Sequence, residues 1–193
     1  MKKSQKALFI SGKKLFWKHG ISRISVEELC SHAGISKMTF YRYYDNKYHL
    51  AREILLAEIT EGVKHYDEIM HTSRPFKERF SDLMIYKASQ AKMMSMELIQ
   101  DLYLDNPENK NLRNFMQDQQ EINFARLRND LIDAQQRGEI RSDLRIDFLM
   151  HLLITFAQQM QNPQLLSQNE TPVDVVKDFA QFFLHGIVEQ RDR

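Results

Sequence analysis

The chain has 193 residues, 42% hydrophobic and 27% charged, with four prolines and six glycines, a composition typical of a helix-rich globular protein with a real core. A single cysteine excludes an intrachain disulfide, no apolar run reaches the length of about eighteen residues that predicts a membrane span, and the N-terminus lacks the apolar segment of a signal peptide, so we expect a cytoplasmic protein. The net charge of +1 hides an asymmetry, since residues 1–53 hold 11 Lys and Arg against 4 Asp and Glu, whereas the remaining residues hold 16 against 22. A basic front joined to an acidic body is typical of a DNA-binding module fused to a module with another role.

Apolar residues at helical spacing predict a first helix over residues 4–19, with Leu8, Leu15 and Phe16 available for packing. Gly20 can end this helix. Lysines surround it at positions 2, 3, 6, 13, 14 and 18, and we expect most of them to be solvated.

Two short helices joined by a tight turn are predicted between residues 25 and 50. Ser25 can cap the first helix, and Glu28, three residues on, can complete a capping box. Gly34 can end that helix by taking a positive φ, and Ser36 is placed to cap the second helix. This order of elements is the outline of a helix-turn-helix.

The second of these helices, predicted over residues 37–44, carries more charged and hydroxyl-bearing side chains than a core needs. Lysine and arginine can bind phosphates, threonine and tyrosine hydroxyls can donate to phosphate oxygens, and methionine can contact a thymine methyl group. Phe40 and Tyr44, four residues apart, are expected to pack inward. A solvated basic face is the alternative for the cationic residues alone, but the caps, the turn and the aromatic residues together favour DNA binding. The residues expected at DNA are Ser25, Ser36, Lys37, Met38, Thr39, Tyr41, Arg42, Tyr43 and Lys47.

The segment from Ile35 to Leu50 resembles the DNA-binding domain of the TetR family of bacterial regulators, through the pattern I-S-x-x-T-x-Y-x-Y-Y-x-x-K-x-x-L. Upstream residues fit the same family, namely Ala7-Leu8, Leu15-Phe16 with Gly20, and Ser25-Val26, so the resemblance covers about residues 3–55. The sequence departs from the family at Met38, where a small residue or proline is often found, and at Tyr43, where histidine is frequent. These departures bear on which operator is bound.

The resemblance implies an all-α protein with a three-helix helix-turn-helix head at residues 1–50, joined by a long helix to a larger helical ligand-binding and dimerisation body at residues 51–193. The long helix is predicted from Asp45, its expected cap, to about Met70. Its tilt would transmit a signal from the body to the head. Further helices are predicted to begin at Pro75, to resume around residues 98–103 after a break, and to run from residue 112 to Gly138.

The last two predicted helices are unusually apolar, because one has a broad apolar face over residues 148–160 and the other a seam over residues 173–187 that Phe179 and Phe182 widen. Such a surface needs a second burial partner, and the same pair of helices from another subunit is the simplest one. The alternative is that all of these side chains face one core. The residues predicted at a homodimer interface are Phe148, Leu152, Phe156, Val176, Ala180, Phe183 and Ile187.

The sequence contains no catalytic or nucleotide-binding motif, so we expect neither an enzyme nor a cofactor. Glu58, Glu61 and His65 lie on neighbouring turns, but exposed glutamates at this spacing are common, and no metal site is predicted there. Ten methionines and several aromatic residues offer adaptable apolar surface for a ligand, although such residues more often form only a core. The residues predicted to line a ligand pocket are Phe80, Met84, Leu98, Tyr103, Phe115, Met116 and Phe124, with the Tyr103 hydroxyl as the polar group.

Taken with the resemblance, these patterns predict a homodimeric repressor that binds double-stranded DNA at an inverted-repeat operator and is released by a small effector. No basic cluster lies along the predicted pocket, which favours a neutral apolar or a cationic effector over a polyanion. The alternative is a DNA-binding structural or partner-recruiting protein without a small-molecule ligand.

Overall fold

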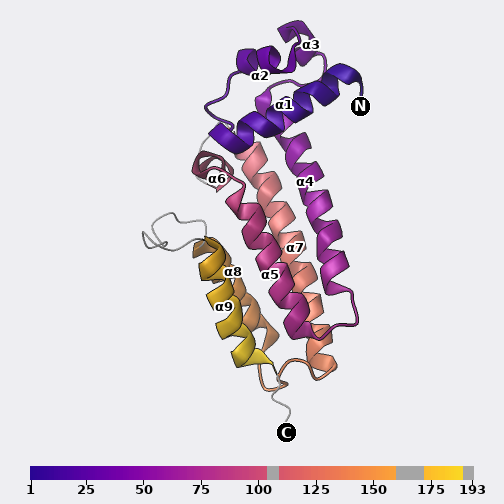
Figure 1. Ribbon diagram of the computed structural model, residues 1–193, viewed down its shortest axis with the longest axis vertical. Coiled ribbons are helices and arrows are strands. Elements are labelled where there is room, and N and C mark those ends of the chain that lie inside the picture. Colours follow the sequence, from indigo (N-terminus) through magenta and orange to yellow (C-terminus); the bar gives the residue numbers. More distant parts are fainter. Residues whose placement is uncertain (104–108, 160–171, 189–193) are drawn as a thin grey trace. The chain divides into compact units, whose positions relative to one another are not determined.

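The computed structural model describes residues 1–103, 109–159 and 172–188, and it confirms the predicted all-α class (Figure 1). Apart from an isolated antiparallel bridge between Ile140 and Val188, the regular structure within these residues is helical. The helices are α1 (Lys3–His19), α2 (Val26–Ala33), α3 (Lys37–Tyr41), α4 (Lys47–Met70), α5 (Phe76–Lys92), α6 (Met96–Tyr103), α7 (Lys110–Gln136), α8 (Ile146–Gln159) and α9 (Pro172–Ile187). No helix in these three segments is long and apolar enough to cross a membrane.

Helix ends fall mainly where the sequence offers a capping residue or a glycine. Gly20 follows α1 with φ 78°, and Gly138 lies just beyond α7 with φ 70°, a region of backbone conformation that favours glycine. The expectation that Asp45 caps the long helix is wrong by one residue. Asn46 Oδ1 accepts a hydrogen bond from the backbone N–H of His49 at 3.0 Å, and α4 begins at Lys47.

Contacts within the chain separate it into two compact units. The first, here called the head unit, comprises residues 1–62 and 93–118, and therefore α1–α3, the first part of α4, α6 and the start of α7. The second, here called the body unit, comprises residues 63–92 and the residues from Gln119 onward. The predicted boundary at residue 50 follows the order of the chain, whereas the head unit also includes α6, which comes from much later in the sequence.

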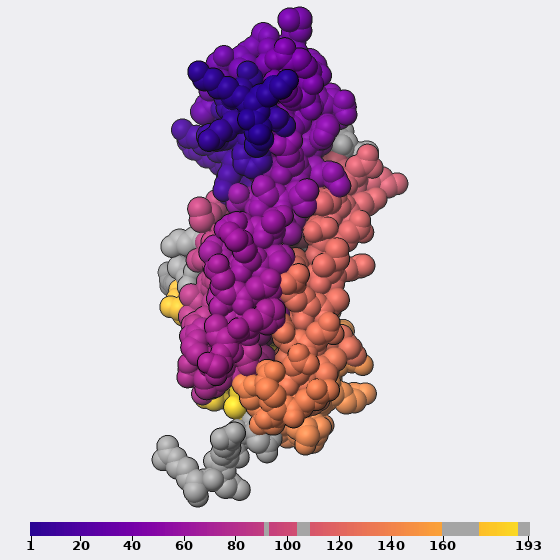
Figure 2. All heavy atoms as spheres, turned by 90° about the vertical axis from the view of Figure 1, so that its right-hand side faces the viewer, coloured from indigo at the N-terminus to yellow at the C-terminus, as the bar shows by residue number. Residues whose placement is uncertain are grey.

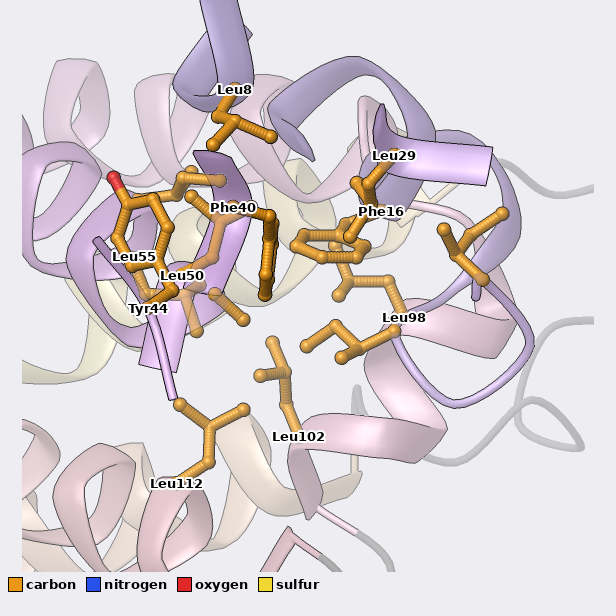
Figure 3. Close-up of a cluster of buried hydrophobic side chains, with 14 of the residues drawn as sticks. Leu8, Phe16, Leu29, Phe40, Tyr44, Leu50, Leu55, Leu98, Leu102 and Leu112 are labelled. Atoms are coloured by element: carbon orange, nitrogen blue, oxygen red, sulfur yellow. The ribbon is translucent and has the colours of Figure 1, made fainter. Parts of the chain in front are cut away.

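An apolar cluster holds the head unit together (Figure 3). Phe16 of α1, Leu29 of α2 and Phe40 of α3 lie around a shared interior, and Leu98 and Leu102 of α6 reach into the same cluster. Each of these five side chains is at most 2% exposed. Because burial of this kind stabilises a fold by roughly 1.5–3 kcal/mol per large apolar side chain, α6 is an integral part of the core on which the helix-turn-helix rests.

The body unit is built on a second apolar cluster and on ion pairs between distant segments. Helix α5 packs along α9, where the rings of Phe80 and Phe183 stack with centroids 5.4 Å apart. The second part of α4 runs beside α7 (Figure 2). Arg126 Nη1 of α7 lies 2.8 Å from Asp67 Oδ1 of α4. These contacts join segments about sixty or more residues apart, so this unit depends on long-range pairing.

Candidate DNA-binding surface

The capping box that begins α2 is present as predicted. Ser25 Oγ accepts a hydrogen bond from the N–H of Glu28 at 3.1 Å, and Glu28 Oε2 accepts one from the N–H of Ser25 at 2.8 Å. The N–H and the hydroxyl of Ser25 both donate to Glu28 Oε2 and lower the pKa of the Glu28 carboxyl. Gly34 ends the helix with φ 65°, and the N–H of Ile35 returns to the carbonyl of Cys30 at 3.0 Å. The backbone is thus fixed at each end of α2 by local groups.

Helix α3 is capped by Ser36, whose Oγ accepts from the N–H of Thr39 at 3.2 Å. The α-helix ends at Tyr41, three residues before the predicted end, and the chain continues as a turn in which the N–H of Tyr44 bonds to the carbonyl of Phe40 at 3.0 Å. Phe40 is 0% and Tyr44 is 1% exposed, so the prediction that they pack inward is confirmed. Burial raises the pKa of Tyr44 to about 12.

The outward side of α3 carries a different set of groups. Met38 is 81% and Tyr41 is 56% exposed, and Lys37 and Arg42 are exposed beside them. Met38 and Tyr41 are three residues apart, so they lie on the same side of the helix. One small surface therefore offers a thioether, a phenol and two cations, the kinds of group that contact thymine methyls, base edges and phosphates.

The two cations on this surface have intramolecular partners. Lys37 Nζ forms an ion pair with the carboxylate of Glu27 on α2, and this hydrogen bond lowers the pKa of Glu27 and raises that of Lys37. The guanidinium of Arg42 lies 5.2 Å from the ring centroid of Tyr43. Sequence reasoning missed Glu27, because a pair ten residues apart across a turn follows no local spacing rule.

Lys47, at the first residue of α4, reaches back to the loop between α1 and α2. Its Nζ donates to the carbonyl of Ser22 at 2.6 Å and to that of Ile24 at 3.0 Å. The loop that leads into the cap of α2 is therefore held by the start of α4. Ser25, Ser36 and Lys47 hold the backbone in place, whereas Lys37, Met38, Tyr41 and Arg42 present their side chains to solvent and Thr39 and Tyr43 are half-buried beside them.

The residues predicted at the dimer interface divide into two groups. The predicted residues on α9 are buried within the subunit itself, each at most 7% exposed: Val176, Ala180, Phe183 and Ile187. On α8, Phe148 is 47% and Leu152 is 37% exposed. On α9 the large apolar side chain of Phe182 is 79% exposed, and this residue is absent from the predicted set. Helical periodicity indicated that α9 is apolar nearly all round, but not which side faces its own chain.

Rings from α8 and α9 also stack directly on each other. Phe156 and Phe179 have centroids 3.6 Å apart and planes within 6°. This stack joins the two helices, and both rings remain half-buried. Phe148, Leu152, Phe156, Phe179 and Phe182 form what we call the α8–α9 apolar face.

The residues predicted to line a pocket belong to different cores. Leu98, Phe115 and Met116 pack in the head unit, Phe80, Met84 and Phe124 pack in the body unit, and Tyr103 is 41% exposed. Met84 lines a hollow of about 280 Å³ between α5 and α9. A larger hollow of about 750 Å³ opens beside the turn between α4 and α5, and its lining includes Arg74, Arg137, Asp130 and Asp133.

Comparison with known proteins gives the family context of this geometry. Residues 11–54 match the family of bacterial regulatory proteins described as the tetR family, and these residues contain α2, α3 and the start of α4. No curated protein matches the chain.

Solved structures share the fold over nearly the whole chain. The fatty acid degradation regulator FadR from Bacillus halodurans has a TM-score of 0.77 at 15% identity, covering 100% of this chain and 99% of that chain. A TetR transcription regulator from Haloarcula marismortui has a TM-score of 0.79 at 13% identity, covering 96% and 98%. FadR from Bacillus subtilis, solved in complex with stearoyl-CoA, has a TM-score of 0.74 at 16% identity, covering 94% and 98%. At these identities the likeness shows a common fold.

Proposed function

We propose that this chain, a member of the TetR family of bacterial regulatory proteins, is a transcriptional repressor that binds an inverted-repeat operator as a homodimer and responds to a small ligand. One observation carries the DNA-binding part of the proposal. Helix α3 buries Phe40 completely while it leaves Met38 81% and Tyr41 56% exposed, on a backbone fixed by caps at Ser25 and Ser36. A short capped helix with an exposed thioether, phenol and cations is suited to the major groove.

The outward residues of α3 have different roles in this proposal. Lys37, Met38 and Tyr41 contact base edges, because they stand at the start and on the outer side of the helix. Thr39, Arg42 and Tyr43 contact phosphates or sugars, and Lys47 adds a phosphate contact to its hold on the loop before α2. Glu27 releases Lys37 when DNA binds, so the ion pair is exchanged for a contact to DNA.

The homodimer is proposed to form through the α8–α9 apolar face. Phe148 and Leu152 of α8 and Phe182 of α9 leave a large apolar area in solvent, and packing this face against its copy would bury it in a four-helix arrangement with a two-fold axis. Two heads related by a two-fold axis require a two-fold symmetric DNA site.

The effector is proposed to be a small apolar or cationic molecule. A long-chain acyl-CoA is the second candidate, because the FadR structure of similar fold from Bacillus subtilis contains stearoyl-CoA. Either molecule releases the operator only if it binds the DNA-incompetent state more tightly than the competent one.

The test begins with a duplex selected by the protein from random DNA and measures operator affinity by fluorescence anisotropy. Titrations with stearoyl-CoA and with the lipophilic cation tetraphenylphosphonium separate the two effector classes, and a set of metabolite mixtures extends the search. A loss of operator affinity with one compound supports a ligand-responsive repressor. Unchanged affinity across all of them favours a DNA-binding structural or partner-recruiting protein.

A further inference from the structure

The loop between α1 and α2 is held by a carboxylate from α6. Asp101 Oδ2 accepts hydrogen bonds from the N–H of Ile21 at 2.5 Å and from the N–H of Ser22 at 2.9 Å, and Asp101 Oδ1 accepts from the Ser22 hydroxyl at 2.5 Å. Two successive backbone N–H groups and a hydroxyl thus surround one anion. These residues are about eighty positions apart in the sequence, and both belong to the head unit.

Ser22 is hydrogen-bonded to two different helices. Its N–H and hydroxyl bond to Asp101 of α6, while its carbonyl accepts from Lys47 Nζ of α4 at 2.6 Å. Three residues later Ser25 begins the capping box of α2. The position of α2, and with it the turn into α3, is therefore set jointly by α4 and α6.

Further contacts join α6 to the end of α1 and to the start of α7. The N–H of Ser95, just before α6, donates to the carbonyl of Trp17 near the end of α1 at 2.9 Å. Gly20 lies so near α6 that an added Cβ would be 2.7 Å from Asp101 Oδ2 and 3.0 Å from Glu97 Cβ. The side-chain amide of Asn109, itself 1% exposed, donates to the backbone carbonyl of Asp101 and ties the start of α7 to the same turn of α6.

We propose that Asp101 is a positioning residue that couples α6 to the DNA-reading helix through the Ile21–Ser22 loop. The inference rests on the proposed function, because it assigns the route by which the body reaches the head. The linking helix α4 is the covalent route, and the Asp101 carboxylate supplies a second, non-covalent one. Since α6 follows α5 after a short turn at residues 93–95, a movement of α5 reaches α6 through the chain itself.

Coupling between two sites is reciprocal, so it can be measured from the DNA side without knowing the effector. If α6 positions the head, then DNA binding must in turn stabilise α6. Amide hydrogen exchange of α6, measured by NMR with and without a duplex selected from random DNA, is expected to slow at least about fivefold when DNA binds.

Asp101→Ala removes the carboxylate that accepts from the two backbone N–H groups and the hydroxyl of the loop. We expect operator affinity to fall about tenfold and the DNA-dependent protection of α6 to disappear. Asp101→Asn is expected to be intermediate, about threefold, because its amide oxygen can still accept from the two backbone N–H groups while the Ser22 hydroxyl turns to accept from the amide. Glu97→Ala, which removes an exposed carboxylate one turn earlier in α6, is the matched control and should behave as the wild type. Ser22→Ala removes one donor and serves if Asp101→Ala does not fold.

The coupling role would be overturned if Asp101→Ala kept the wild-type degree of DNA-dependent protection of α6. If that variant does not fold, the same result in both single variants, Ser22→Ala and Asp101→Asn, would overturn it. A separate readout covers failure of the proposed function itself. If the wild type binds no duplex, exchange of the Ile21 and Ser22 amides in the free protein still decides the structural part: faster exchange in Asp101→Ala supports the positioning role, and unchanged exchange refutes it.

Discussion

The head unit and the body unit are both helical, but their backbones are fixed by different means. In the head, α2 and α3 begin at serine caps that bond three residues ahead, and α2 ends at a left-handed glycine. In the body, the N-terminus of α5 is held by Glu139, which lies about sixty residues away and accepts from the N–H of Phe76. Because local caps fix the backbone of the head, the outer side chains of α3 remain available for DNA. Because contacts between distant segments fix the backbone of the body, the body can change conformation when those contacts rearrange.

The two units also differ in what they leave in solvent. The head exposes cations around Met38 and Tyr41, while the body exposes the phenyl rings of Phe148 and Phe182. Polar and cationic surface fits a polyanion, and apolar surface fits a second protein surface. This difference is the physical basis for assigning DNA binding to one unit and self-association to the other.

Neighbouring phenylalanines of α9 provide the largest expected effect and the sharpest test of this assignment. Phe183 is 3% exposed in the chain's own core, so Phe183→Glu should prevent stable folding, because it buries an unpaired charge. Phe182 is 79% exposed, so Phe182→Glu should leave the subunit folded but raise the dimer dissociation constant by about 100-fold or more. Circular dichroism and sedimentation velocity separate the two outcomes. A wild-type chain that sediments as a monomer at micromolar concentration contradicts the proposed interface.

Long-range fixing in the body predicts the next largest effect. Arg79 is 5% exposed, and its Nη2 lies 3.2 Å from Glu139 Oε2. Glu139→Ala would leave this buried guanidinium without its carboxylate and should lower the free energy of unfolding by about 3 kcal/mol in urea titrations. Asp143→Ala, which breaks an exposed pair with Arg141, is the control and should change stability little. Equal effects of the two variants would contradict the importance of the buried pair.

Substitutions in and next to α3 test the proposed DNA-binding surface of the head. Tyr41→Ala should cost about 1–3 kcal/mol of binding free energy on the preferred DNA sequence and less on other sequences. Lys47→Ala should weaken binding to all sequences and reduce the salt dependence by about one phosphate contact. Anisotropy titrations at several salt concentrations measure both quantities. If neither substitution changes operator affinity at moderate salt, the surface of α3 is not the DNA-binding surface.

The smallest expected effect is a pH dependence of body stability. Burial raises the pKa of Glu139, but the hydrogen bonds from Arg137 and from the N–H of Phe76, with the charge of Arg79, outweigh it and lower that pKa below its ordinary value. A carboxyl with a lowered folded-state pKa contributes stability above its unfolded pKa and loses it as the pH falls through the folded pKa. Urea midpoints should therefore fall on acidification below the ordinary glutamate pKa, and they should fall less in Glu139→Gln. If the urea midpoints of the wild type and of Glu139→Gln fell in parallel as the pH is lowered, Glu139 would not be the source of the pH dependence.

The sequence was informative where the determining contacts are local. Ser25, Glu28, Gly34 and Ser36 act within four residues of their partners, and the predicted capping and turn are found in the structure. The inward packing of Phe40 and Tyr44 followed from their four-residue spacing. The break between α5 and α6 and the end of α7 near Gly138 were likewise predicted.

Contacts between distant segments could not be predicted from residue spacing. Nothing in the spacing of Asp101 indicates that it meets Ser22, and nothing in α9 distinguishes Phe183, inside the core, from Phe182, in solvent. An all-round apolar helix has two candidate faces, and the choice between them depends on where α5 packs. The predicted pocket residues divide between the two clusters for the same reason, since helical periodicity gives a face but not its partner.

The central claim is that α3 of each subunit reads one half of a two-fold symmetric DNA site. Selection of duplexes from a random library by the wild-type protein, with sequencing of the bound fraction, tests it most directly. We predict enrichment of an inverted repeat with half-sites spaced by about one or two turns of the double helix, and loss of preference at particular base pairs when Met38 or Tyr41 is changed to alanine. Enrichment of no sequence, or of the same sequence by wild type and by both variants, would contradict the account.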